Sequence, residues 1–110
     1  LDAANVLTAK VSAKPEHWKD GTSPEYTSHF RSSLAYRMAL IANGEFDAML
    51  TLRGTWEWDI AAGALLVSEA GGLVSDRRGN ALQFNNAKPM VDGVLAAPAT
   101  LHKTLLSKLA

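Results

Sequence analysis

The carboxylate best placed to do chemistry in this sequence is Asp59, which stands between Trp58 and the small-residue run Ile-Ala-Ala-Gly. A helix of such residues can approach another backbone closely, and the free amides at its start carry a partial positive charge. A strand pattern leads into this segment, and ends of strands beside helix starts are where α/β proteins bind ligands. The start of the helix behind Asp59 could therefore hold a cation or a phosphate. The simpler alternative is a helix cap, because aspartate is a favoured N-cap residue.

A second group of polar side chains precedes another predicted helix. Ser32 and Ser33 stand at its start, followed by Leu34 and Ala35. Two hydroxyls beside free helix-start amides make a reasonable site for an anion or a sugar hydroxyl. The alternative is that Ser32 caps the helix while Ser33 faces solvent.

Composition removes several other classes of function. Lysine plus arginine and aspartate plus glutamate both number 11, so the net charge is zero and gives no bulk case for binding nucleic acid or an anionic membrane. There is no cysteine, which excludes disulfides and thiolate metal sites and fits a cytoplasmic protein. No apolar run approaches the roughly 20 residues that span a bilayer. The three histidines share no ligand spacing.

The elements that must position these residues follow from periodicity. A helix is expected to begin at Phe30 and to stop at Gly44. Its apolar face is expected to hold Phe30, Leu34, Met38 and Ile41. Arg31 and Arg37 are expected to lie off that face. A second helix is expected over 60–70, ended by Gly71-Gly72. Thr100 is expected to cap a third. The expected strands cover 6–11, 46–53 with an end at Gly54, 73–75, 81–84 and 94–97.

This order predicts an α/β fold, with helices packed on a mixed sheet, in one domain over residues 1–110. The segment 12–28 contains Pro15, Gly21, Pro24 and many polar residues. It is expected to form a long flexible loop.

The motif from Trp58 to Gly63, together with Glu69-Ala70-Gly71-Gly72, resembles the C-terminal signature of the inositol monophosphatase superfamily. These proteins are magnesium-dependent, lithium-sensitive phosphatases of sugars and nucleotides. The resemblance implies the C-terminal layer of the inositol monophosphatase/sugar phosphatase fold, with Asp59 as a Mg²⁺ ligand. It also implies that Ser32 and Ser33 contact substrate, although Arg31 or Ser32 replaces the usual glycine.

The resemblance leaves two substrates open. Inositol monophosphatases usually carry a glutamate before the Trp-Asp pair, and the stretch from Thr51 to Gly54 has none. The pattern looks more like the 3′(2′),5′-bisphosphate nucleotidase branch, which acts on 3′-phosphoadenosine 5′-phosphate. Arg53 could then bind a second phosphate, since guanidinium suits phosphate geometry. The alternative is that Arg53 is a solvated charge at the end of a strand.

The family's remaining metal ligands lie in an N-terminal half that this sequence does not contain. The resemblance therefore implies that the chain is the C-terminal portion of a longer phosphatase, and that the isolated 110 residues are inactive. A rival hypothesis is a non-catalytic α/β module with a structural or assembly role. Self-association into a homodimer is a further expectation, because a half-domain leaves apolar surface uncovered.

Overall fold

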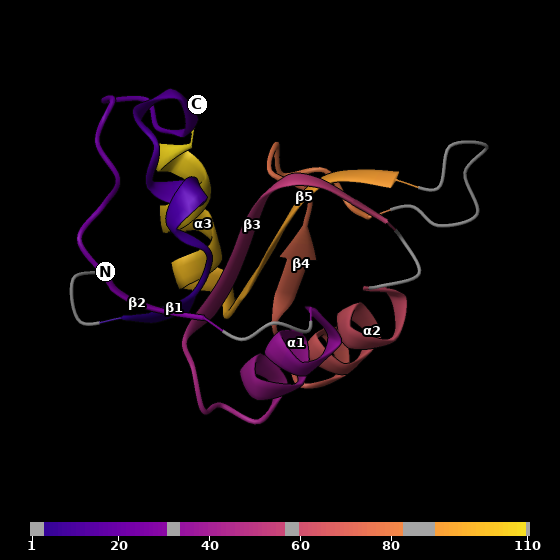
Figure 1. Ribbon diagram of the computed structural model, residues 1–110. Helices are drawn as coiled ribbons and strands as arrows, with labels where there is room; N and C mark the ends of the chain where they lie inside the picture. The colour runs from indigo at the N-terminus through magenta and orange to yellow at the C-terminus, as the bar shows by residue number, and fades with distance from the viewer. Residues whose placement is uncertain (1–3, 31–33, 57–59, 83–89, 110) are drawn as a thin grey trace.

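The computed structural model describes residues 4–30, 34–56, 60–82 and 90–109, which form a sheet with helices on both faces (Figure 1). The strands are β1 (Asn5–Leu7), β2 (Thr27–His29), β3 (Ala48–Trp56), β4 (Leu73–Ser75) and β5 (Met90–Ala97). They lie in the order β2-β1-β3-β5-β4. β1 runs parallel to both β2 and β3, whereas β5 is antiparallel to β3 and β4. The predicted mixed sheet is confirmed.

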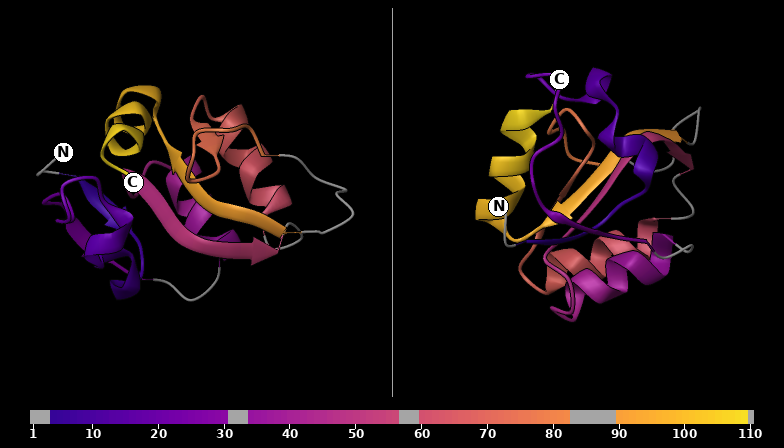
Figure 2. Two further views of the ribbon diagram at one scale, coloured as in Figure 1. Left: turned by 90° about the horizontal axis from the view of Figure 1, so that it is seen from above. Right: turned by 60° about the vertical axis from the view of Figure 1, so that its left-hand side comes forward.

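The helices α1 (Leu34–Ala42) and α2 (Ala61–Glu69) cover one face of the sheet, and α3 (Ala99–Lys108) covers the other (Figures 1 and 2). Two short 3₁₀ helices, η1 (Lys10–Ala13) and η2 (Pro15–His17), follow β1. Within the described ranges, no helix is long and apolar enough to cross a membrane.

The central strands supply a separate core to each face because successive side chains of a strand point to opposite sides. Met49 of β3 and Ala96 of β5 join the cluster under α1 and α2. Their neighbours Leu50 and Leu95 join the cluster under α3, with Leu105 of that helix. All five side chains are fully buried. A shift of one residue in either strand would exchange the two cores, so burial on both faces fixes the register.

A β-bulge explains why β3 continues past Gly54, where the sequence pattern predicted its end. Thr51 pairs with Val94, but Gly54 pairs with Asp92, so β3 holds one more residue than β5 between these pairs. Gly93 sits opposite the extra residue with a φ of 75°. Bulges bend a strand and increase its twist, and β3 arches strongly across the sheet in Figure 1.

The segment 12–28 contains more regular backbone structure than the predicted loop. It contains η2 and the start of β2, and Trp18 is 3% exposed. The Trp18 indole Nε1–H donates to the carbonyl oxygen of Ser12 at 2.8 Å, and Trp18 also pairs with Leu109 in an antiparallel bridge. A buried aromatic ring therefore ties the segment to the end of α3. Its mobility stays a prediction.

Two smaller predictions about element boundaries were wrong, and a third is only partly described. The first strand ends at Leu7 because η1 begins at Lys10. α3 begins at Ala99, directly after Pro98, so Thr100 lies inside the helix and is not its cap. In the region of the predicted strand 81–84, Ala81 forms an isolated bridge with Ser75, and residues 83 and 84 lie outside the described part of the chain.

A buried histidine links α3 to β4. His102 is 5% exposed, and its Nε2 lies 2.8 Å from the Oγ of Ser75. The Ser75 hydroxyl donates to the carbonyl oxygen of Asp76 at 2.9 Å, so the Nε2–H of His102 donates to Ser75. Nδ1 is then left without a hydrogen-bond partner among the described residues. Burial, followed by the nearby charge of Lys103, lowers the pKa of His102 below its ordinary value.

Gly93 is predicted to be the glycine least tolerant of substitution. A Cβ placed there would lie 2.6 Å from the carbonyl oxygen of Thr51, and the φ of 75° is itself unfavourable for alanine. Gly93→Ala is expected to lower the free energy of unfolding by about 2 kcal/mol or more, measured by urea denaturation. Gly21→Ala is the matched control, because Gly21 has a φ of 70° with nothing within 4 Å of the added Cβ. Equal losses in the two variants would contradict the close approach.

Acidification is predicted to destabilise the protein through His102. The pKa of His102 in the folded state lies below the ordinary 6.5. Between these two pKa values the unfolded state therefore binds more protons than the folded state. Stability from the neutral imidazole is present above pH 6.5 and lost as the pH falls toward the folded-state pKa. His102→Gln is expected to flatten the fall in unfolding free energy between about pH 7 and 5. An unchanged slope would refute the prediction, and His29→Gln is the control.

Candidate active site

Both segments that carry the predicted site residues follow the carboxyl ends of strands. β2 ends at His29 before Ser32 and Ser33, and β3 ends at Trp56 before Asp59. Because β1 is parallel to both strands, the carboxyl ends of β2 and β3 point in the same direction. In open α/β sheets, ligands bind outside these carboxyl ends.

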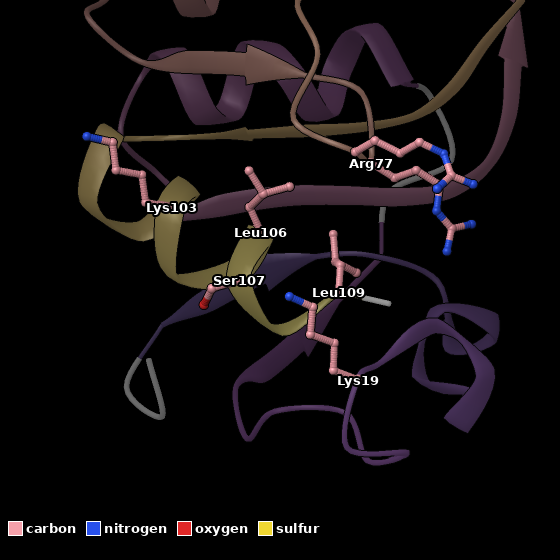
Figure 3. A pocket seen from close by; sticks show the side chains of 7 residues that line it. Lys19, Arg77, Lys103, Leu106, Ser107 and Leu109 are labelled. Carbon is pink, nitrogen blue, oxygen red and sulfur yellow. The ribbon is translucent and has the colours of Figure 1, made fainter.

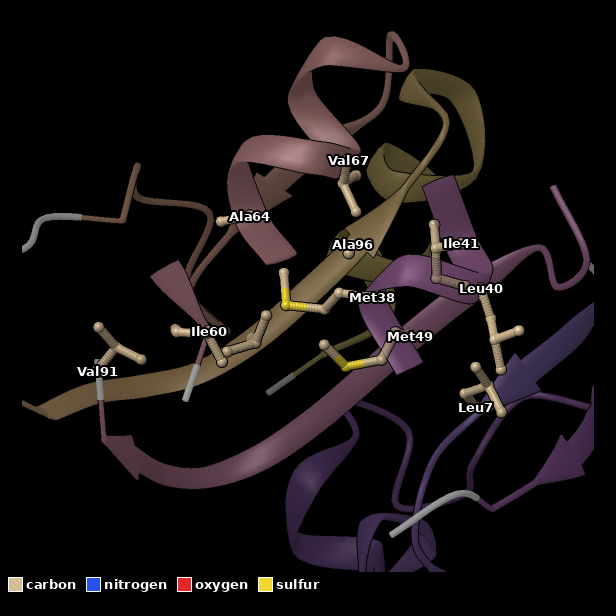
Figure 4. Close-up of a cluster of buried hydrophobic side chains, with 11 residues drawn as sticks. Leu7, Met38, Leu40, Ile41, Met49, Ile60, Ala64, Val67, Val91 and Ala96 are labelled. Carbon is tan, nitrogen blue, oxygen red and sulfur yellow. The ribbon is translucent and has the colours of Figure 1, made fainter. Parts of the chain in front are cut away.

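The helices that follow these segments pack side by side and run in the same direction. A Cβ on Gly63 would lie 2.8 Å from both the Cβ and the Sδ of Met38, so the backbone of α2 approaches α1 closely at this point. Their carboxyl-terminal ends also meet, because residues 41–44 and residues 67 and 70–72 line one cavity of about 280 Å³. Figure 4 shows Met38 in the cluster between the two helices and the sheet.

The amino-terminal ends of α1 and α2 therefore lie on the same side of the molecule. Met38 lies four residues after Leu34, and Gly63 lies two residues after Ala61. At 1.5 Å of rise per residue, the two helix starts are offset by only about 3 Å along their axes. Each start offers free amides and the positive end of a helix dipole. Together they make one region suited to an anion.

The predicted site residues lie next to the two helix starts in the sequence. Ser32, Ser33 and Asp59 lie outside the described residues, so their placement stays a prediction. Arg53 belongs to the bulged part of β3, and its side chain is outside the description too. The N-cap position of α2 falls on Ile60, whose side chain is fully buried and makes no capping hydrogen bond. The helix start is thus held by burial of Ile60 rather than by an aspartate at that position.

Arg37 is the residue near this region that the sequence pattern misplaced. It was expected off the apolar face of α1, yet it is 4% exposed. Its Nη1 lies 3.5 Å from the Oγ1 of Thr51 in β3, and its guanidinium stacks 4.9 Å from the ring centre of Phe30. A signal was present, because Arg37 follows Leu34 by three positions and precedes Ile41 by four, which places it on the apolar stripe.

The contacts of Arg37 give it a positioning role. Phe30 is the last described residue before α1, and a cation over an aromatic face is attractive by about 0.5–2 kcal/mol. Arg37 thereby ties the approach to α1 to the second turn of the helix and to the centre of β3.

The described residues do not form a complete metal site. Across 4–30, 34–56, 60–82 and 90–109, no three His, Cys, Asp or Glu side chains come together in a way that could hold a metal ion. A metal ion at this region would need ligands from outside the described residues.

Comparisons with known proteins agree on one family. The model of the inositol monophosphatase family matches residues 2–110. The Nus factor SuhB of Pseudomonas aeruginosa is 58% identical over 43 residues, which cover 39% of this chain and 16% of SuhB. The 3′(2′),5′-bisphosphate nucleotidase CysQ of Aggregatibacter actinomycetemcomitans is 33% identical over 67 residues, covering 61% of this chain and 25% of CysQ.

Solved structures agree on the fold. SaIMPase-II, the inositol monophosphatase-II of Staphylococcus aureus, was crystallised with inositol monophosphate bound, and it superposes with a TM-score of 0.77 at 18% identity. The match covers 97% of this chain and 41% of SaIMPase-II. This chain therefore spans about two-fifths of the length of that solved relative.

The close approach of α1 and α2 can be tested by substitution of Gly63. Gly63→Ala is expected to lower the unfolding free energy by about 1–3 kcal/mol, although alanine is the better helix former by about 1 kcal/mol. Met38→Ala removes the Sδ, one of the two atoms that the added Cβ would meet, so the double variant is expected to lose less than the sum of the single losses, measured by urea denaturation. Strictly additive losses would show that the two residues do not meet.

Proposed function

Because the chain belongs to the inositol monophosphatase family, we propose that it is part of a Mg²⁺-dependent, lithium-sensitive phosphomonoester hydrolase of the cytoplasm. The observation that carries this proposal is the pair of helix starts on one side of the molecule. One follows Ser32-Ser33 and the other follows Trp58-Asp59. Two sets of free amides, two hydroxyls and one carboxylate are the groups that a phosphate and its metal ion require.

The proposed Mg²⁺ ligand in this chain is Asp59. A carboxylate oxygen is the hard ligand that Mg²⁺ prefers, but Mg²⁺ normally takes further oxygen ligands in near-octahedral geometry. The described residues supply no such set, so the other ligands must come from outside them. When bound, the metal would neutralise charge on the phosphate and lower the pKa of a bound water.

The chain's own residues bind and orient the substrate in this proposal. The amides at the starts of α1 and α2 and the hydroxyls of Ser32 and Ser33 hold phosphate or sugar oxygens. Buried Ile60, one position after Asp59, fixes where α2 begins. The Arg37–Phe30 contact fixes the approach to α1.

The substrate is a small phosphorylated metabolite, either inositol monophosphate or 3′-phosphoadenosine 5′-phosphate. The family favours the first, and the similarity to CysQ favours the second. Arg53 at the bulge of β3 is the proposed contact for a second phosphate. Comparing hydrolysis of the two compounds by the complete protein would assign the substrate.

The exposed side of α2 supports a larger assembly. Leu65 and Leu66 are 59% and 49% exposed, and the opposite side of α2 packs in the core through Ala64 and Val67. A helix that is apolar all round is normally covered all round. We propose that α2 is covered in the complete protein, by the rest of the phosphatase or by a second copy in a homodimer.

Replacing Asp59 tests the proposed function. In the complete protein, Asp59→Asn is expected to lower phosphatase turnover by about two orders of magnitude or more while leaving the unfolding free energy nearly unchanged, because a neutral amide is a poor Mg²⁺ ligand. Asp20→Asn is the control, since Asp20 is exposed and remote in sequence. Steady-state phosphate release as a function of Mg²⁺ concentration measures the effect. Near-normal turnover, with at most a small loss of stability, would favour a non-catalytic module instead.

A further inference from the structure

A cationic groove lies on the α3 side of the sheet, away from the helix pair that carries the proposed active site. It has a volume of about 500 Å³. Four of its lining residues are cationic, namely Lys19, Arg77, Arg78 and Lys103. Leu106 and Leu109 supply an apolar floor (Figure 3). The zero net charge of the whole chain conceals this local concentration of positive charge.

The turn that carries the two arginines is held rigidly. The carboxylate Oδ1 of Asp76 accepts hydrogen bonds from the backbone amides of Arg78 and Asn80, both at 2.9 Å. Gly79 packs so tightly on α3 that an added Cβ would lie 2.8 Å from Leu106. The arginine side of the groove is therefore formed before any ligand arrives.

The opposite wall is held in the same way. The backbone amide of Lys19 donates to the carbonyl oxygen of Lys108 at 3.0 Å. Its neighbour Trp18 is buried and bridges Leu109. A preformed site loses less conformational entropy on binding, which favours affinity.

Arg77 keeps its positive charge uncompensated within the described residues. One guanidinium nitrogen donates to the carbonyl oxygen of Leu52 at 2.7 Å, and another lies 3.3 Å from Nδ1 of His17. Neither partner is anionic. Arg78 forms an ion pair with the carboxylate of Asp92 at 3.0 Å. Asp92 is not among the residues that line the groove, and no acidic side chain lines the described groove. The groove is thus complementary to negative charge.

The spread of the cations indicates the shape of the ligand. In Figure 3, Lys103 and Arg77 extend toward opposite ends of the groove, with Leu106 between them. The cations are thus spread along the groove rather than gathered at one point. None of the lining residues is aromatic, so the groove lacks the stacking platforms that bind single-stranded nucleic acid.

We propose that this groove binds an acidic peptide segment of a partner protein, in which carboxylates flank an apolar side chain. The carboxylates would meet Lys103 at one end and the arginines at the other. The apolar side chain would cover Leu106 and Leu109. Such a surface gives charge-steered, salt-sensitive association in addition to the proposed phosphatase activity, and it does not depend on that activity.

The probe that tests the proposal is a fluorescein-labelled peptide with two glutamates on each side of a central leucine, titrated with the complete protein by fluorescence anisotropy. Lys103→Glu is expected to weaken binding about tenfold at low salt, because it reverses a charge at one end of the groove. Lys19→Glu is a second variant with the same expectation. Lys14→Glu is the matched control, since Lys14 is exposed and does not line the groove. Circular dichroism verifies the fold of each variant.

The proposal also requires that a peptide with serine in place of the leucine binds more weakly than the parent peptide. Equal weakening in the groove variants and in Lys14→Glu would overturn the proposal. So would an absence of peptide binding, or tighter groove-dependent binding of tripolyphosphate or of a single-stranded oligonucleotide.

Discussion

The close approach of Thr51 and Gly93 is the constraint on which the candidate active site and the cationic groove both depend. No side chain fits between the two strands there, because a Cβ on Gly93 would meet the Thr51 carbonyl oxygen at 2.6 Å. The resulting bulge bends β3, so the strand can pack on both cores and still lead toward the start of α2. It also interrupts the ladder at Leu52, whose carbonyl oxygen accepts the hydrogen bond of Arg77. An unpaired buried carbonyl is costly, so this hydrogen bond stabilises the bulge and fixes the arginine.

The sequence predicted those parts of the fold that depend on local chemistry. The positive φ of 76° at Gly44 and of 90° at Gly71 explains why those glycines end α1 and α2 as expected. Alternation predicted the inner part of β3, because Met49 and Leu50 must reach different cores. It failed at Gly54, since a glycine in a strand can mark either an end or a bulge. The choice depends on Gly93, which is distant in sequence and becomes a neighbour only after the sheet forms.

The candidate site was predictable as a motif but not as a geometry. Asp59 and Ser32 stand out because polar groups precede helices of small or apolar residues. That the two helix starts lie together depends on Met38 packing on Gly63, a contact that no spacing encodes. Arg37 was misplaced for a related reason. A charged residue is normally assigned to solvent, yet the long guanidinium reaches Thr51 and Phe30 from a buried position.

The two faces of the sheet divide the chemistry of this chain. The α1 and α2 face offers helix-start amides, a geometry that suits a compact anion. The α3 face offers separated cations over an apolar floor, which suits an extended ligand. β3 and β5 take part in both, and their alternating side chains keep the two cores distinct. Because the Arg77 hydrogen bond lies at the bulge of β3, the arginine side of the groove and the strand that leads toward α2 share one structural element.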